Sequence, residues 1–447
     1  MPPPMPAPIP IREDLHTHVT QALGETPVWD LHTHLYPPSF GSPLAGSGSS
    51  ADPSGLMLWG IDELLTYHYL VAEIFRATSR DELSYERYWS LSQAEQADLI
   101  WVRLFRQQSP LSEACRGVLT TLSRLGLDPD EPTLAGYRKW FAEQDPSDHI
   151  DRVMQLAGVE RITMTNDVFD DNERQRWLDN PQIGADSRFR GVLRFDPLLC
   201  DWPTSASRLR EWGYAVDEGG FSRQTIEESQ RFLREWFQRV GAVYGAVSLP
   251  PTFRYPAPSS DRTAVAGEQA LVRIVLPVCE ELGLPFAMMI GVTRSVNPAI
   301  RLAGDTVGLA DVTSVANLCR DFPQQKFLCT MLARENQHEL AVTGRKFANL
   351  LPFGCWWFLN NPSLIEEMTR MRLELLGTSF VPQHSDCRVL EQLIYKWDHS
   401  REVIARVLTD KYADLAATGY AVTDDAIKRD VHQLLWGTTE QWLAGKH

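Results

Sequence analysis

The fold is decided by residues 28–34, which read Val28-Trp29-Asp30-Leu31-His32-Thr33-His34. An apolar run that ends in His-x-His predicts a buried strand whose last residues reach a surface. Side chains two residues apart on a strand point to the same face, so His32 and His34 project together. Two fixed imidazoles supply half of a tetrahedral metal shell. The alternative is a pair of surface histidines after an ordinary strand.

Seven further apolar runs alternate with helix-length segments in the second part of the chain. The runs are 159–165, 189–195, 242–249, 285–291, 326–332, 349–356 and 378–386. Helix-length segments follow at 223–240, 263–282, 308–321, 361–376 and 387–417. Eight such units predict an α/β fold, a (β/α)8 TIM-type barrel. A doubly wound sheet competes, but no G-x-G-x-x-G or Walker loop follows any run.

The predicted barrel comprises residues 28–36 and 150–447, with a helical insertion after strand one. Residues 1–27 are predicted to be an N-terminal arm and a short helix, and residues 37–149 a flexible loop followed by the helical insertion. The Gly/Ser/Pro-rich stretch 37–55 is interpreted either as a mobile flap over a site or as a disordered surface loop. The first helix carries a second His-x-His, His16 and His18, whose imidazoles diverge on a helix.

Composition limits the classes of partner. The net charge of −15 disfavours nucleic acid and anionic membrane surfaces. Seven scattered cysteines without a C-x-x-C pair fit a reducing compartment. No signal peptide or apolar window of about 18 residues is visible, so a cytoplasmic protein is predicted. Only seven of the 43 basic residues are lysines, and this arginine bias suits carboxylate recognition.

Barrel enzymes carry their active sites at the carboxyl ends of the strands. Those ends hold His32 and His34, Thr165-Asn166-Asp167, Arg194 and Asp196, Ser248, Gly291 with Arg294, Trp356, and His384-Ser385-Asp386 with Arg388. No lysine falls at a predicted strand end, so the bridging lysine carbamate of binuclear hydrolases is not expected.

The first and eighth strands are neighbours once a barrel closes. His32, His34 and Asp386 therefore predict a site for one divalent metal ion, with Zn²⁺ preferred and Mn²⁺ or Fe²⁺ as alternatives. A set of two histidines and one carboxylate also occurs in iron oxygenases, so the ligands alone do not fix the reaction.

Several short motifs occur in a particular order along the chain. They are Asp30-Leu31-His32-Thr33-His34-Leu35, His68-Tyr69, Thr165-Asn166-Asp167, Ile290-Gly291-x-x-Arg294-x-x-Asn297, Gly304-Asp305-Thr306, Phe353-Gly354-Cys355-Trp356-Trp357-Phe358 and Ser385-Asp386-Cys387-Arg388. The ordered set resembles the uronate isomerases (glucuronate/galacturonate isomerases), a branch of the amidohydrolase superfamily. The resemblance spans most of the chain and is weak through most of the helical insertion.

The resemblance implies an aldose–ketose isomerisation of an open-chain hexuronate, by abstraction of the C2 proton with metal assistance. His32, His34 and Asp386 would hold the metal, and Asp386 would also serve as the base or lie beside it. The remaining implied roles are stabilisation of the enediolate oxygen by Arg388 and Tyr69, positioning of Tyr69 by His68, and clamping of the C6 carboxylate by Arg194. Fixed positive charge where an oxyanion forms is what such a proton abstraction requires.

Two tryptophans and two departures from the family pattern complete the candidate site. Arg294 is assigned with Trp356 to substrate binding, with Trp356 as a flat apolar wall, whereas Trp357 is equally compatible with core packing. Met289 stands where the family has a histidine, and Ser248-Leu249 replaces an Asp-His pair. His384 is predicted either to replace the lost imidazole in part, as a further metal ligand, or to be a core histidine.

Three functions therefore remain open on the sequence. A hexuronate isomerase comes first, and a mononuclear metal-dependent hydrolase or decarboxylase on the same barrel is the alternative. A non-catalytic sugar-acid binder is the third. Each takes a small sugar acid as its ligand, and association into a homo-oligomer is expected because large barrels often associate.

Overall fold

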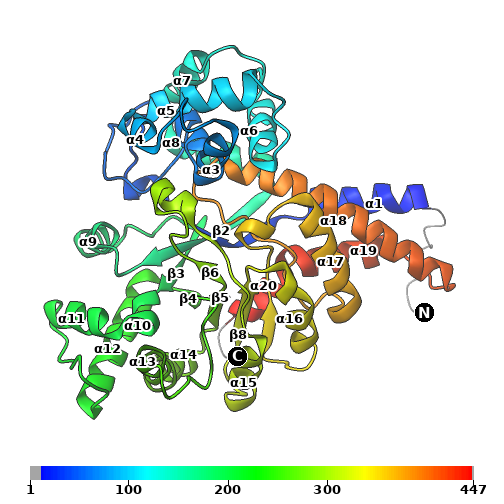
Figure 1. Ribbon diagram of the computed structural model, residues 1–447. Coiled ribbons are helices and arrows are strands. Elements are labelled where there is room, and N and C mark those ends of the chain that lie inside the picture. The colour runs from blue at the N-terminus through cyan, green and yellow to red at the C-terminus, as the bar shows by residue number, and fades with distance from the viewer. Residues whose placement is uncertain (1–11, 445–447) are drawn as a thin grey trace.

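A parallel sheet forms the centre of the molecule. The computed structural model describes residues 12–444, so the predicted arm at 1–10 lies outside the described residues. The seven strands, in their order across the sheet, are β1 (Val28–Thr33), β2 (Val159–Asp167), β3 (Phe189–Arg194), β4 (Gly245–Leu249), β5 (Phe286–Ile290), β8 (Phe327–Met331) and β9 (Leu350–Pro352). Every neighbouring pair is parallel, and Figure 1 shows the sheet curling with helices outside it.

The segment predicted as the eighth strand closes this sheet without forming a regular strand. Val381 makes a single parallel bridge to Phe353, next to β9. Farther along, the Asp386 N–H donates to the His32 carbonyl at 3.0 Å, and the His34 N–H donates to the Cys387 carbonyl at 2.7 Å. Pro382 has no N–H to donate, and Asp386 adopts a left-handed φ of 53°, so a continuous ladder cannot form. The TIM-type barrel is confirmed, with an irregular eighth element.

Helices cover the outside of the barrel. The predicted helical segments are confirmed at α12 (Arg223–Val240), α15 (Val312–Asp321), α17 (Pro362–Leu376) and α18 (Gln392–Ala417). Residues 262–282 form one helical stretch of α13 (Arg262–Ala270), the π-helical turn η3 (Leu271–Val275) and α14 (Leu276–Leu282). The remaining outer helices are α9 (Asp171–Asp179), α10 (Asp196–Cys200), α11 (Trp202–Glu211) and α16 (Gln337–Gly344).

The insertion after β1 is helical, as predicted, and gathers on one side of the barrel (Figure 1). It contains α2 (Ile61–Leu65), α3 (His68–Ala77), α4 (Tyr85–Ser90), α5 (Gln93–Ile100), the π-helical η2 (Trp101–Arg106), α6 (Glu113–Arg124), α7 (Ala135–Ala142) and α8 (Pro146–Ala157). The connection before it has little regular structure but is anchored: Asp52 pairs with Arg176 at 2.8 Å, and the Trp59 indole donates to Ser42 at 2.8 Å.

A buried histidine–glutamate pair links this insertion to the residue before α18 (Gln392–Ala417). His149 of α8 lies 2.7 Å from Glu391, measured between Nε2 and Oε1, and neither side chain is exposed. The other carboxylate oxygen of Glu391 accepts from the Gly60 N–H at 3.1 Å. Helix α18, which begins at the next residue, contacts both α6 and α8.

The first and last helices that the structure describes pack against α18 and beside β1. In α1 (Arg12–Glu25), His16 contacts Thr409 and His18 contacts Asp424, so these two imidazoles diverge as predicted. The last elements are α19 (Asp424–His432), η7 (Gln433–Gly437) and α20 (Thr438–Leu443). Trp436 of η7 packs against Trp29 of β1, with ring centroids 5.5 Å apart. No helix among residues 12–444 is long and apolar enough to cross a membrane.

Candidate active site

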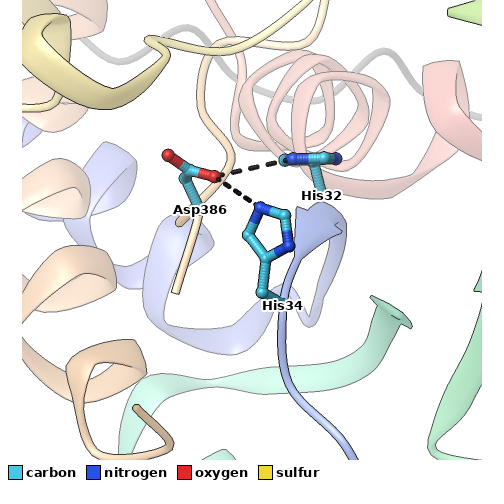
Figure 2. A group of neighbouring side chains, drawn as sticks. All are labelled: His32, His34 and Asp386. Atoms are coloured by element: carbon cyan, nitrogen blue, oxygen red, sulfur yellow. Dashed lines mark ion pairs between the residues drawn. The ribbon is translucent and has the colours of Figure 1, made fainter. Parts of the chain in front are cut away.

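Two imidazoles and one carboxylate converge where β1 ends. Figure 2 shows Asp386 facing His32 and His34, with one carboxylate oxygen directed at both rings. The Nε2 atoms of His32 and His34 each lie 3.5 Å from Asp386 Oδ1. Donor atoms of all three side chains lie within 4.8 Å of one another. The structure therefore brings the three predicted metal ligands together.

Local backbone geometry explains why these side chains meet. The two histidines alternate with the buried Thr33 and so project to the same side of β1. The His32 Nδ1 lies 3.3 Å from the Thr165 hydroxyl, which orients the ring and leaves Nε2 toward Asp386. Asp386 is held to the His32 backbone through its own N–H, and its left-handed φ turns the side chain back over β1.

These groups perturb one another electrostatically. Burial, followed by the charge of His34, holds the pKa of His32 well below its ordinary value, and burial also lowers the pKa of His34. Burial alone would raise the pKa of Asp386, but a hydrogen bond from His34 and the charges of both histidines lower it below the ordinary range. Two neutral imidazoles beside an ionised carboxylate are the protonation states in which these side chains bind metal.

The geometry fits a divalent ion. Neighbouring ligand atoms of a tetrahedral zinc site lie about 3.4 Å apart when the bonds are about 2.1 Å long. The 3.5 Å separations from Asp386 to both imidazoles are close to that value. The His32 Nε2 is also buried without a hydrogen-bond partner, which is costly unless another group satisfies it.

A cavity of about 120 Å³ opens beside the three ligands. Its other lining residues come from β3, β4, β5, the insertion, the loops after β5 and β9, and the segment before α18: Tyr67, His68, Arg194, Ser248, Met289, Arg294, Leu302, Asp305, Trp356, Trp357 and Arg388. Ser248 and Met289 are register partners on β4 and β5, so the two departures from the family pattern sit side by side.

Three arginines line the cavity and differ in how they are paired. Arg194 forms an ion pair with Asp196, and this carboxylate raises the pKa of Arg194 although burial lowers it. Arg294 pairs with Asp305 at 2.5 Å. Arg388 forms no ion pair with any residue in the part of the chain that the structure describes, so its guanidinium remains available to an anion in the cavity.

Comparison with solved structures places the chain in a family. A uronate isomerase from Bacillus halodurans C-125 is 50% identical, covers 98% of each chain, and superposes with a TM-score of 0.89. The chain belongs to the uronate isomerase family. No family model matches it, and no curated protein matches it either.

More distant uronate isomerases share the fold. One from Thermotoga maritima is 16% identical over 96% of this chain and 97% of its own, with a TM-score of 0.72. A glucuronate isomerase from Caulobacter crescentus is 14% identical over 97% of this chain and 94% of its own, with a TM-score of 0.71. At this identity the likeness concerns the fold alone.

Of the two residues of the predicted His68-Tyr69 motif, His68 lines the ligand cavity and Tyr69 does not. His68 lines the cavity, and burial lowers its pKa to about 3. Tyr69 lines a neighbouring cavity, whereas Tyr67 faces the ligand cavity. Tyr67 is the extended residue before α3, whereas Tyr69 lies in its first turn. The three rings pack against one another, but of the two tyrosines only Tyr67 lines the ligand cavity.

His384 lies behind the ligand group and does not join it. Its ring packs 5.4 Å from that of His32, between centroids, and 5.2 Å from Phe353. Gly354 has to be a glycine because a Cβ there would lie 1.7 Å from His384 Nδ1. His384 is outside the group of three ligand atoms, but both of its ring nitrogens are buried without a hydrogen-bond partner among the described residues, so both predicted roles remain open.

Both tryptophans after β9 line the cavity, although Trp357 was equally compatible with core packing. Trp357 has a left-handed φ of 47°, which turns its side chain toward the same side as Trp356. Asp305 also faces the cavity. The motif Gly304-Asp305-Thr306 contributed to the family resemblance, but no role was predicted for Asp305. Tyr67 carried no motif of its own and was missed.

Proposed function

We propose that this protein interconverts the aldose and ketose forms of an open-chain hexuronate. The observation that carries the proposal is the arrangement of His32, His34 and Asp386 opposite three arginines in one cavity of a uronate isomerase. A sugar acid needs a cationic partner for its carboxylate, and its isomerisation needs a base beside a stabilised oxyanion. This cavity offers both groups within a small volume.

The substrate carboxylate is assigned to Arg194. A planar guanidinium binds a carboxylate through two parallel hydrogen bonds. Asp196 holds the Nε edge of Arg194 at 3.0 Å and so fixes the plane of the guanidinium beside the cavity. Arg294 and Trp356 complete the substrate contacts, with the indole as an apolar wall for the carbon chain.

Proton transfer is assigned to Asp386 and His68. Asp386 lines the cavity with an ionised carboxylate, and we assign to it the acceptance of the C2 proton once the neighbouring carbonyl is polarised. His68 stays neutral, and its buried Nε2 has no partner within the described residues, so it can relay a proton to a substrate oxygen. The unpaired Arg388 stabilises the enediolate oxygen that forms.

One divalent ion held by His32, His34 and Asp386 would polarise the substrate carbonyl as a Lewis acid. Zn²⁺ suits two imidazoles and a carboxylate, with Mn²⁺ and Fe²⁺ as alternatives. We assign the hydroxyl contact to Tyr67, which faces the cavity, in place of Tyr69.

Proton NMR in D₂O tests the reaction. Glucuronate and galacturonate are incubated separately with the enzyme, with and without a chelator. An isomerase produces the ketose and places deuterium at C2 of the recovered aldose. Binding of a uronate without exchange or turnover would support a binder instead. Hydrolysis or decarboxylation of a sugar-acid derivative without C2 exchange would support the hydrolase class.

The cysteines support a second, independent proposal, that the protein works in the cytoplasm. All seven are free thiols, and six of them are buried. Such usage is typical of a reducing compartment. Fractionation of the source cells with an antibody against the protein tests it, and recovery outside the cytoplasmic fraction would contradict it.

A further inference from the structure

Ser385, the residue before the metal ligand Asp386, has both of its backbone polar groups fixed by buried charged side chains. Its N–H donates to Asp30 Oδ1 at 3.1 Å. Its carbonyl accepts from Lys396 Nζ at 2.6 Å and from the Asn360 side-chain amide at 3.1 Å. Ser385 and Asp30 are fully buried, and Lys396 is 3% exposed.

These two side chains come from elements on opposite sides of Ser385. Asp30 lies on β1, two residues before His32, and the register of β1 against β2 shifts between Asp30 and Thr33. Lys396 lies in the first part of α18, and the next residue on that helix, Trp397, donates its indole N–H to Asp30 Oδ2 at 2.8 Å. One helix therefore holds the Ser385 carbonyl directly and the Ser385 N–H through Asp30.

The backbone at Asp386 needs such support. Its φ of 53° belongs to the left-handed region, which a residue with a Cβ adopts only when its surroundings determine it. Burying a carboxylate and an amine here is costly, and packing alone does not require either group.

We propose that Asp30 and Lys396 are positioning residues, which clamp Ser385 so that the Asp386 carboxylate meets the two imidazoles. The proposal rests on the function proposed above, because it assumes that the three side chains hold a metal ion. It assigns a role to a lysine that no strand-end motif indicates. Neither residue faces the cavity, so both act through Asp386.

Removing the lysine donor is the first test. Lys396→Met keeps the length and most of the volume of the side chain but cannot donate to Ser385. Zn²⁺ affinity of the metal-free protein, measured by equilibrium dialysis, should fall at least tenfold, as is common when a partner behind a ligand is lost. The value of kcat should fall by a larger factor than that by which KM changes. Excess Zn²⁺ should restore much of the lost kcat.

His399→Gln is the matched control. His399 lies one turn farther along α18, is buried, and bonds to Glu113 and Thr120 of α6 without touching Ser385. Its loss should lower the melting temperature but leave the Zn²⁺ affinity within twofold of the native value. Equal Zn²⁺ affinities in Lys396→Met and the native protein would overturn the clamp.

Asp30→Asn keeps the proposal testable if Lys396→Met does not fold. The amide matches the carboxylate in shape but places an N–H₂ group against either Ser385 or Trp397, so Zn²⁺ affinity should again fall about tenfold or more. Because both residues hold the same turn, the fold loss of Zn²⁺ affinity in the double variant should be smaller than the product of the fold losses in the two single variants. Full additivity would contradict a shared clamp.

The outcomes separate the two proposals. If the native protein neither binds Zn²⁺ nor isomerises a uronate, the proposed function fails and the clamp fails with it. If the native protein does both and the variants match it, the clamp alone fails.

Discussion

Two histidine–carboxylate groups differ in this protein, although both join segments that are far apart in the chain. At the cavity, Asp386 lies 3.5 Å from each imidazole, and His34 remains 28% exposed. Under the insertion, Glu391 lies 2.7 Å from His149, and neither side chain is exposed. The second carboxylate already has its donors, including the Gly60 N–H, whereas the first has room for an ion between the groups.

The difference suits the group at Asp386 to binding a ligand and the pair at Glu391 to stabilising the fold. In the closed pair, His149 Nε2 and the Glu391 carboxylate bond to each other and link two parts of the chain, although His149 Nδ1 has no hydrogen-bond partner among the described residues. In the open group, the side chains are held near one another but leave their donor atoms for a ligand. The following predictions test whether chemistry and stability divide between the two groups in this way.

The largest effect is expected for Asp386→Asn. The amide cannot accept the C2 proton and binds a cation poorly, so kcat should fall about 10³-fold. The free energy of unfolding of the metal-free protein should change by less than about 1 kcal/mol, because the backbone contacts of residue 386 remain. Steady-state kinetics with the preferred uronate and urea denaturation measure the two quantities. Retention of more than a tenth of kcat would contradict the assigned role.

Glu391→Ala should have the opposite signature. It leaves His149 and the Gly60 N–H buried without their partner, so the free energy of unfolding should fall by about 3 kcal/mol. The value of kcat, measured well below the melting temperature, should stay within about threefold of the native value. The exposed variant Glu160→Ala controls for the loss of a negative charge. A large loss of kcat with unchanged stability would show that the closed pair also serves the reaction.

Zinc should stabilise the protein only through the open group. At a free concentration 100 times Kd, one bound ion adds about 2.7 kcal/mol to the free energy of unfolding. Differential scanning fluorimetry should show this as a higher melting temperature in the native protein and in Glu391→Ala, and a chelator should abolish it. An equal shift in Asp386→Asn would place the ion elsewhere.

Glu173 extends the comparison to a third buried carboxylate, beside the end of β2. Burial raises its pKa to about 8, although Asn166, the Asp167 N–H and Tyr36 all donate to it. The folded protein therefore holds more protons than the unfolded chain between pH 4.5 and about 8, so its stability falls as pH rises through that window.

Glu173→Gln should flatten this decline and gain roughly 1 to 2 kcal/mol at pH 8 relative to pH 5. Urea denaturation at a series of pH values measures it. Glu160→Gln, on an exposed position of β2, is the matched control and should leave the profile unchanged. If the stability of Glu173→Gln fell with pH as steeply as that of the native protein, another group would be responsible for the pH dependence.

The barrel and the ligand group could be predicted because both follow from strand periodicity. Alternation on β1 pairs His32 with His34, and closure of a barrel brings the eighth segment beside the first. Strand boundaries were less predictable at 378–386, where Pro382 and the left-handed Asp386 prevent a regular ladder. Hydrophobic pattern indicates burial there but not backbone pairing.

Side-chain directions in loops and at helix starts could not be predicted in the same way. Which of Tyr67 and Tyr69 faces the cavity depends on where α3 begins, and three adjacent aromatics give no periodic signal. Lys396 lies in α18, the helix after the eighth segment of the barrel, and only the folded packing carries its amine to Ser385. A search for functional residues at the carboxyl ends of the strands therefore misses residues, such as Lys396, that contact the backbone next to a site residue.

The irregular segment that closes the sheet has a consequence for biosynthesis. β1 is made early by the ribosome, yet the residues that bond to its free edge, around Asp386 and Cys387, emerge only after most of the polypeptide has been translated. Until then this edge stays open, and contacts so distant in sequence form late. The side chains of His32, His34 and Asp386 therefore come together only near the end of translation.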